Sequence, residues 1–264
     1  MDHRDLIVEQ FTKQAVPFST APGIQDREAL ALLVEAARAG ADDTVLDVAC
    51  GPGLVVCAFA AVARHATGID LTPAMIERAR ALALEKGLGN VTWQVGDVLP
   101  LPFASASFSV VVCRFAFHHF LQPERVLAEM TRVCRPGGTV AVVDVVAAAD
   151  PMTARAFNRM ERLRDPSHVR ALTLAEIEAL FPAAGLPDPR LTFYRLEGEL
   201  EGLLERSFPD PGDVAEIRRM FDDSLAADGL GLGTRRKGDT IRFAYPVAIA
   251  VSSKSGAPGA SPSR

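Results

Sequence analysis

Residues 44–56 read TVLDVACGPGLVV, and this stretch decides which fold the chain can adopt. An apolar run of strand length, interrupted by Asp47, leads into the turn-forming residues 50–53 and then into a helix-like apolar segment. A strand, a tight turn and a helix start in this order present free backbone N–H groups to a ligand. Gly51 and Gly53 allow the backbone a positive φ or a close approach to that ligand. Asp47 falls at the carboxyl end of the strand, the edge where open α/β sheets bind ligands.

A glycine turn alone is weak evidence, because an α/β protein can use one merely to turn a corner. Residues 67–70, TGID, add a second short strand that ends in Asp70. This acid follows the first strand by about 20 residues, the spacing at which dinucleotide folds place a ribose-binding carboxylate. The pattern DxxCGxG lacks the third glycine that accompanies a pyrophosphate in GxGxxG. A nucleoside without a diphosphate therefore fits better than a nicotinamide dinucleotide.

A third acid follows the next predicted strand. Residues 91–95 form an apolar run of strand length, and Asp97 comes directly after it. The carboxyl ends of parallel strands meet at one edge, so Asp97 should lie on the same edge as Asp47 and Asp70. A carboxylate at this place can accept a hydrogen bond from an exocyclic amine.

Two further segments carry family-specific patterns. Residues 99–120, LPLPFASASFSVVVCRFAFHHF, contain a strand predicted to be buried on both faces, and RPGG at 135–138 precedes the strand TVAVVDVV. With motifs at four successive strand ends, residues 42–146 resemble the class I S-adenosylmethionine-dependent methyltransferases. The resemblance implies an α/β, Rossmann-like seven-stranded sheet of order 3-2-1-4-5-7-6, with the last strand antiparallel, helices on both faces and a small helical cap.

The same resemblance implies S-adenosyl-L-methionine as the cofactor and S-adenosyl-L-homocysteine as the product. In the family, the acid after the third strand takes the adenine amino group, and Val98 lies beside the ring. The first turn of the helix that begins at Thr72 and Pro73 also borders the adenine. The residues predicted to bind the cofactor are Asp47, Ala49, Gly51, Gly53, Asp70, Leu71, Met75, Asp97, Val98, Arg114 and Phe11.

The later part of the chain narrows the resemblance. Residues 157–181, FNRMERLRDPSHVRALTLAEIEALF, occur together with CRFAFHHF in a branch of small-molecule methyltransferases. This branch, methyltransferase type 11, is related to the ubiquinone and menaquinone methylases and includes the bacterial YcgJ-like group. The resemblance implies O-, N- or C-methylation of a small-molecule acceptor. The residues predicted to bind that acceptor are Phe18, Phe115, His119, Arg164 and His168.

Histidines provide the candidate catalytic groups. His118 and His119 follow a buried strand at the edge where the transferable methyl group would lie, and His168 lies in a polar loop between two helices. We expect no metal, because adjacent residues point in different directions and no CxxC or HExxH pattern accompanies them. An imidazole titrates near neutral pH and can serve as a general base or orient the substrate. A purely structural pair of histidines fits the sequence equally well.

Composition limits the partners and the cellular compartment. The 264 residues carry a formal charge of -5 and show no basic stripe, which disfavours a nucleic-acid partner. The charged start and the lack of a long apolar run argue against a signal peptide and a membrane span, so we expect a cytoplasmic monomer or homodimer. The cysteines lie in apolar segments without metal-like spacing, which predicts buried free thiols.

The predicted organisation has three parts. Residues 1–24 form an arm over the cofactor, with a helix over 2–15, and residues 252–264 form a disordered tail. Residues 25–251 form the methyltransferase domain, in which 151–185 and 197–237 are cap or lid elements. Within this domain the pattern predicts a helix over 54–65, a helix capped by Thr72, and a capping box formed by Thr173 and Glu176.

Two other functional classes remain open from the sequence. The cofactor site can serve a different reaction, such as a cyclisation, without methyl transfer. Alternatively, the chain can bind S-adenosylmethionine without catalysis. Intact glycines and acids argue against a loss of binding, but they do not distinguish these alternatives from a methyltransferase.

Overall fold

The structure, a computed structural model, describes residues 2–20 and 24–256, except for the side chains of residues 18–20. The predicted acceptor residue Phe18 has its backbone in the first helix, but its side chain lies outside the described residues. Residues 257–264 of the predicted tail also lie outside the described residues.

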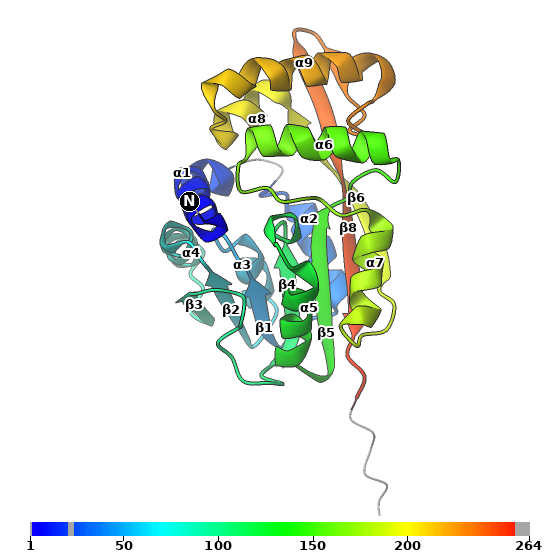
Figure 1. Cartoon of the computed structure of the whole chain (residues 1–264). Coiled ribbons are helices and arrows are strands. Elements are labelled where there is room, and N and C mark those ends of the chain that lie inside the picture. Colours follow the sequence, from blue (N-terminus) through cyan, green and yellow to red (C-terminus); the bar gives the residue numbers. More distant parts are fainter. Residues whose placement is uncertain (1, 21–23, 257–264) are drawn as a thin grey trace, which may run out of the picture.

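A single twisted sheet forms the centre of the described part of the chain (Figure 1). Its order is β3-β2-β1-β4-β5-β8-β6, with the short β7 paired to β8. β8 runs antiparallel to both of its long neighbours. The predicted order 3-2-1-4-5-7-6 is therefore confirmed, and β7 is an eighth strand that the prediction lacked. The strands are β1 Thr44–Val48, β2 His65–Asp70, β3 Val91–Val95, β4 Phe108–Arg114, β5 Cys134–Val145, β6 Arg190–Glu199, β7 Arg235–Lys237 and β8 Thr240–Ser253.

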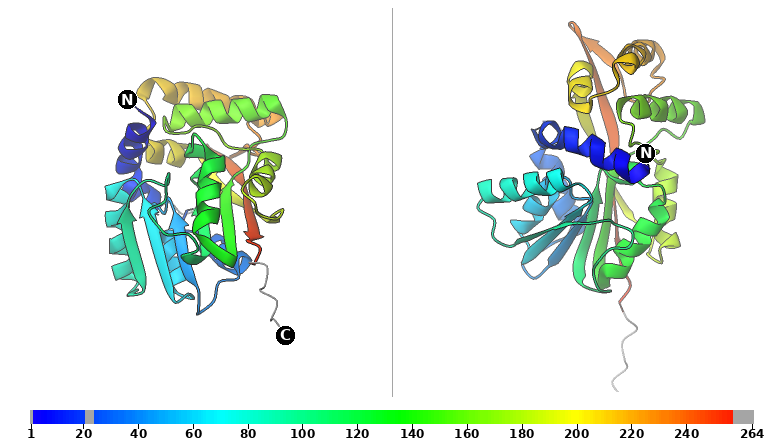
Figure 2. Two further views of the ribbon diagram at one scale, coloured as in Figure 1. Left: turned by 60° about the horizontal axis from the view of Figure 1, so that its bottom comes forward. Right: turned by 60° about the vertical axis from the view of Figure 1, so that its left-hand side comes forward.

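Helices cover both faces of the sheet, as predicted (Figures 1 and 2). The strand β4 shows why both faces need cover, because Val110 and Val112 enter one hydrophobic cluster while Val111 and Cys113 enter the other. Described cysteines are all buried free thiols. The helices are α1 His3–Thr20, α2 Arg27–Ala37, α3 Leu54–Ala60, α4 Pro73–Glu85, the 3-10 turn η1 Phe117–His119, α5 Pro123–Val133, α6 Pro151–Arg164, α7 Leu174–Ala183, α8 Leu200–Ser207 and α9 Pro211–Ala227.

Two predicted helix boundaries differ from the structure. The helix predicted over 54–65 ends at Ala60, because His65 already pairs with Thr44 in the parallel register of β1 and β2. The first helix continues to Thr20, well past the predicted residue 15.

The predicted caps give one correction and one confirmation. Thr72 makes no side-chain capping bond to α4; instead its backbone N–H donates to Asp70, 2.8 Å away. Thr173 and Glu176 form the predicted capping box at the start of α7. Asp26 caps α2 by accepting from two backbone N–H groups.

Three helices, α6, α8 and α9, lie together at one end of the sheet, beside the part of β6 and β8 that extends beyond β5 (Figure 1). They fall within the segments 151–185 and 197–237 that were predicted as cap elements. α7 also falls within the predicted segment 151–185, yet it packs on the sheet beside α5, with Ile177 and Phe181 in the core. α1 lies between the sheet and these cap helices (Figure 2).

The end of the domain extends past the predicted boundary at Val251. β8 continues to Ser253, and Lys254 donates from its Nζ to the carbonyls of Thr131 and Cys134, 2.7 and 2.8 Å away. No helix within residues 2–20 and 24–256 has the length and hydropathy needed to cross a bilayer.

The capping box of α7 provides a stability test. Thr173→Ala leaves the Glu176 backbone N–H without its side-chain acceptor, so we expect the free energy of unfolding to fall by about 1 kcal/mol. Urea denaturation of the wild type and the variant measures this change. Thr240→Ala, a surface change with a local hydrogen bond, is the control, and an equal loss in both variants would contradict a special role for the cap.

Candidate active site

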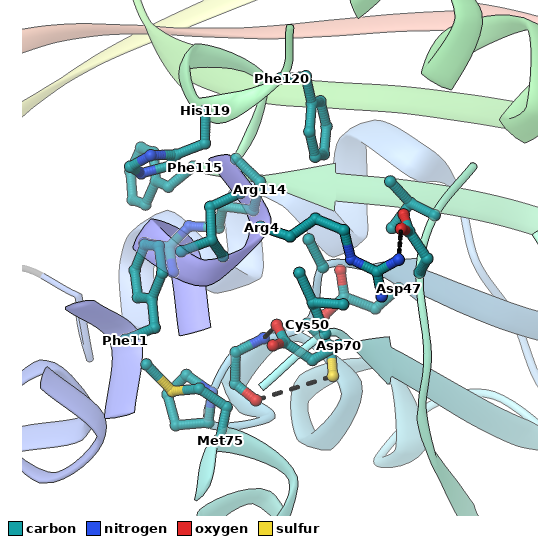
Figure 3. A pocket seen from close by; sticks show the side chains of 18 of the residues that line it. Arg4, Phe11, Asp47, Cys50, Asp70, Met75, Arg114, Phe115, His119 and Phe120 are labelled. Carbon is teal, nitrogen blue, oxygen red and sulfur yellow. Dashed lines mark hydrogen bonds and ion pairs between the residues drawn. The ribbon is translucent and has the colours of Figure 1, made fainter. Parts of the chain in front are cut away.

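A cavity of about 260 Å³, here called the first cavity, lies at the carboxyl ends of β1, β2 and β4 and is covered by α1 (Figure 3). Loops that follow these parallel strands meet here, so residues far apart in sequence share one lining. Every predicted cofactor residue except Gly53 lines it, namely Phe11, Asp47, Ala49, Gly51, Asp70, Leu71, Met75, Asp97, Val98 and Arg114.

The two glycines of the turn have different tasks. Gly51 lines the first cavity with a φ of 50°, and a Cβ added to it would meet no atom within 4 Å. Gly53 has a φ of 82°, but its Cβ would lie 2.5 Å from the ring of Trp93 and 2.7 Å from Ala79. Gly51 therefore leaves open space in the cavity, whereas Gly53 allows the turn to pack against its neighbours.

Asp70 connects the ends of two strands. Its Oδ2 accepts from the backbone N–H of Gly51, and its Oδ1 accepts from that of Thr72, both at 2.8 Å. Burial raises the pKa of Asp70, although these two backbone bonds partly oppose the rise. Each carboxylate oxygen has a further lone pair, so the side chain can still accept from two hydroxyl groups of a ligand.

Asp47 is an acid in the first cavity whose hydrogen-bond acceptors are unsatisfied. Both of its carboxylate oxygens are buried and have no hydrogen-bond partner in the structure. Burial raises the pKa of Asp47 well above its usual range, although the positive charge of Arg114 opposes this rise. Buried polar atoms are normally hydrogen-bonded, so these oxygens indicate a ligand that brings its own donors, such as an ammonium group.

Strained backbone occurs at two places in the lining. Ala49 and Phe115 have φ values of 57° and 58°, and they follow the ends of β1 and β4 respectively. Such conformations are uncommon in residues with a Cβ and persist where the surrounding structure determines them. The ring of Phe115 lies against the guanidinium of Arg114, with 4.3 Å between the Cζ atom and the ring centroid.

The helix α1 is attached to the rim of the first cavity by polar contacts. His3 Nε2 lies 2.7 Å from the carbonyl oxygen of His119, and Arg4 forms a 3.2 Å ion pair with Asp97 (Figure 3). Farther along the helix, Gln10 donates to the carbonyl of Ser207 at 2.6 Å. α1 therefore joins the rim of the first cavity to the cap helix α8.

A second cavity of about 140 Å³ adjoins the first. The two share four lining residues, Phe11, Ile24, Phe115 and His119. The second cavity continues under the cap, where α6 and β8 contribute polar side chains. Arg164, predicted to bind the acceptor, is among them.

His118 lines the second cavity and is held by Asp144. Its Nδ1 lies 2.6 Å from one carboxylate oxygen of Asp144, and its backbone N–H donates to the other at 3.1 Å. A carboxylate accepts, so Nδ1 carries the proton of this bond and Nε2 is the remaining basic nitrogen. Burial lowers the pKa of His118, but the charge and hydrogen bond of Asp144 outweigh burial and raise the pKa above the ordinary 6.5.

His119 lies where the two cavities meet and behaves differently. Its Nδ1 donates to the carbonyl of Ser167, 3.0 Å away, and its ring packs edge-on against Phe11. Burial, together with the charge of His118, lowers the pKa of His119 to about 4. A neutral His119 can accept a hydrogen bond and orient a ligand, but it is a weak base near neutral pH.

His168 lines neither cavity. Its Nε2 lies 2.8 Å from Asn158 Oδ1, which also accepts from the backbone N–H of Ala171. That second bond identifies the Asn158 atom as the oxygen, so His168 donates to it. Burial lowers the pKa of His168, and its side chain is buried in the core.

A second buried network lies beside His118 and was not predicted. Glu161 accepts from Tyr245 at 2.7 Å and from Arg164 at 2.5 and 3.1 Å, and Arg164 also donates to Ser207 at 3.0 Å. Sequence signals existed for part of it, because Glu161 and Arg164 have the i,i+3 spacing of a helical ion pair. In the sequence, Asp144 is recognisable only as an acid near the end of an apolar strand.

No group of three or more His, Cys, Asp and Glu side chains in the described ranges is arranged for a metal ion.

The fold and the site together define a Rossmann-like domain with a cavity at the carboxyl ends of its parallel strands. Comparison with known proteins identifies it further. A model of the methyltransferase domain matches residues 46–142. The methyltransferase YcgJ of Bacillus subtilis is 34% identical over 238 residues, which cover 88% of this chain and 93% of that protein. The chain therefore belongs to the methyltransferase family, in the group that includes YcgJ.

Solved structures agree with this assignment. The crystal structure of YcgJ superposes with a TM-score of 0.79 and 29% identity, covering 87% of this chain and 99% of that one. BH2331 of Bacillus halodurans gives a TM-score of 0.80 at 26% identity, covering 86% and 99%. A Haemonchus contortus N-methyltransferase, solved with S-adenosylhomocysteine, shares the fold with a TM-score of 0.69 at 16% identity, covering 97% and 60%.

The two glycines of the turn yield a paired prediction. Gly51→Ala adds only the strain of a positive φ, whereas Gly53→Ala adds the same strain and a steric overlap with Trp93. We expect Gly53→Ala to lower the free energy of unfolding by about 1–3 kcal/mol more than Gly51→Ala, because overpacking typically costs that amount. Urea denaturation of both variants measures the difference, and equal stabilities would show that the Trp93 contact does not limit this position.

Proposed function

We propose that this protein transfers the methyl group of S-adenosyl-L-methionine to a small-molecule acceptor. The observation that carries the proposal is the buried Asp47 carboxylate, which has no partner and lies in the same cavity as Asp70 and Gly51. An amino-acid ammonium group satisfies Asp47, and ribose hydroxyl groups suit the free lone pairs of Asp70. S-adenosylmethionine carries both groups in one molecule.

The remaining lining suits the rest of this cofactor. Met75 and Val98 offer apolar contacts for an adenine ring, and Asp97 offers a carboxylate for its amino group. Asp97 already pairs with Arg4 through one oxygen and accepts from the Leu99 N–H through the other, so an adenine amino group would share an oxygen with one of them. S-adenosylhomocysteine in the N-methyltransferase of the same fold supports this choice of ligand.

The bound cofactor would supply an electrophilic methyl group for an in-line displacement. The protein's part is to orient the acceptor, and correct orientation can lower such a barrier by about 7–11 kcal/mol at its upper end. The second cavity is the natural acceptor site, because Phe115 and His119 line both cavities. We propose Phe115, His119 and Arg164 as acceptor-binding residues.

Asp70→Ala tests the cofactor site by isothermal titration calorimetry with S-adenosylmethionine and S-adenosylhomocysteine. Removing the carboxylate deletes hydrogen bonds to the ribose, so we expect affinity to fall about 10- to 100-fold, equivalent to roughly 1.5–3 kcal/mol. Asp43→Ala is the matched control, since Asp43 lies before the opposite end of β1 and bonds the N–H of Gly40. Equal affinity in wild type and Asp70→Ala would contradict the proposed site.

Gly51→Val supplies an independent test, because Asp70 also holds the turn and its loss could act through the backbone. The valine side chain would enter open space in the first cavity. We expect S-adenosylhomocysteine binding to be lost while circular dichroism still shows the folded domain. Normal binding by a folded Gly51→Val protein would show that the ligand does not approach this turn.

A further inference from the structure

We propose that the second cavity receives a single aromatic ring with a hydroxyl group, and that His118, positioned by Asp144, accepts the hydroxyl proton when the oxygen is methylated. This inference rests on the proposed function and names the acceptor class and the base for it. Size, lining and the distribution of charge in the cavity carry the argument.

The size and walls of the second cavity suit one ring. Its volume of about 140 Å³ is close to that of a cavity of ~150 Å³ that binds benzene in another protein. Aromatic side chains form much of the wall, including Phe11, Phe115, Phe243 and Tyr245. The Phe243 and Tyr245 rings pack edge to face with centroids 5.3 Å apart, and such walls favour an aromatic guest.

The charged groups of this cavity already have partners, with two exceptions. Asp165 accepts from Ser167, and Glu197 pairs with Arg235. Glu161 is neutralised by Arg164 and also accepts from Tyr245, so it is not available as a base. Burial raises the pKa of Glu161, but Arg164 outweighs burial and lowers it, which weakens its basicity further. The exceptions are Nε2 of His118 and the guanidinium of Arg206, which forms none of the ion pairs found in the described part of the chain.

The pairing with Asp144 makes His118 suitable as a base. Asp144 fixes the ring through Nδ1, so Nε2 is the nitrogen available to a ligand in the cavity. A positive charge on His118, once it takes a proton, is stabilised by the Asp144 carboxylate. The Arg206 guanidinium also lines this cavity and favours an acceptor oxygen that becomes negative. The titratable groups that face His118 are Asp144, Glu161, Arg164, His119 and His168.

The proposed step conserves atoms and charge. The O–H bond of the acceptor breaks, and its proton moves to Nε2 of His118. An oxygen lone pair forms the new O–CH₃ bond while the S–CH₃ bond breaks and leaves its electron pair on sulfur. The products are an aryl methyl ether, neutral S-adenosylhomocysteine and a protonated His118, which later returns its proton to water.

A direct test uses 4-nitrophenol, because its phenolate absorbs at longer wavelength than the neutral phenol. We expect the protein saturated with S-adenosylhomocysteine to bind 4-nitrophenol and to raise its ionised fraction at a fixed pH below neutrality. His118→Gln should abolish this spectral change. His65→Gln is the control variant and should retain this change, because His65 lies at the start of β2, lines neither cavity and bonds Thr92. Nitrobenzene should bind without any such change. Absence of binding, or an unchanged spectral shift in His118→Gln, would overturn the proposal.

The pH dependence of methyl transfer gives a second readout, with catechol as the probe acceptor. A base must be deprotonated to act, so kcat/KM should rise with pH through the raised pKa of His118. Asp144→Asn removes the charge that raises this pKa, so the rise should move to lower pH by about one unit or more. His118→Gln should lower kcat about 10²- to 10⁴-fold without changing the affinity for S-adenosylhomocysteine.

The outcomes separate this inference from the proposed function. If S-adenosylhomocysteine binds and aniline is methylated while catechol is not, the acceptor class is wrong and the methyltransferase function stands. If neither S-adenosylmethionine nor S-adenosylhomocysteine binds the folded protein, the proposed function itself fails. If Asp144→Asn leaves the pH profile at the same pH as in the wild type, the proposed role of the His118–Asp144 pair is wrong.

Discussion

The site depends on the hydrogen bonds that the carboxylate of Asp70 accepts. It accepts from the backbone after β1 and from the backbone after β2, so one buried side chain sets the position of both loops. The glycine turn is thereby held against the end of the sheet, with Gly51 open to the first cavity and Gly53 packed on Trp93. A buried carboxylate needs hydrogen-bond donors, and the backbone N–H groups of the two loops need an acceptor. The hydrogen bonds between them satisfy both.

Around the two loops that Asp70 holds, other segments of the chain enclose the open edge of the sheet and form two adjoining cavities. α1 covers the first cavity and is attached to both the sheet edge and α8. The cap contributes Glu161 and Arg164, which neutralise each other in the second cavity. Phe115 and His119, just after the end of β4 and in the turn that follows it, line both cavities; in the proposed reaction they hold the acceptor beside the cofactor.

Three histidines in one region acquire three different properties from their neighbours. Asp144 raises the pKa of His118, whereas burial beside His118 lowers the pKa of His119 to about 4. His168 donates to Asn158 in the core and reaches neither cavity. Side chains of the same type therefore range from a potential base to a structural contact, because burial, neighbouring charges and hydrogen-bond partners differ among them.

The sequence by itself determined the two-sided cover of β4 and the glycine turn and acids of the first cavity, because each depends on local patterns. The sheet order and the other residues of that cavity were predicted from the resemblance of these motifs to a known family. Strand ends, glycine turns and acids that follow strands are periodic or adjacent features, and parallel strands bring their ends to one edge. The boundary near Ala60, the pairing of His118 with Asp144 and the second cavity were decided by the tertiary structure alone. These features depend on contacts between segments far apart in the chain, where pairing, burial and charge act together and leave no local pattern.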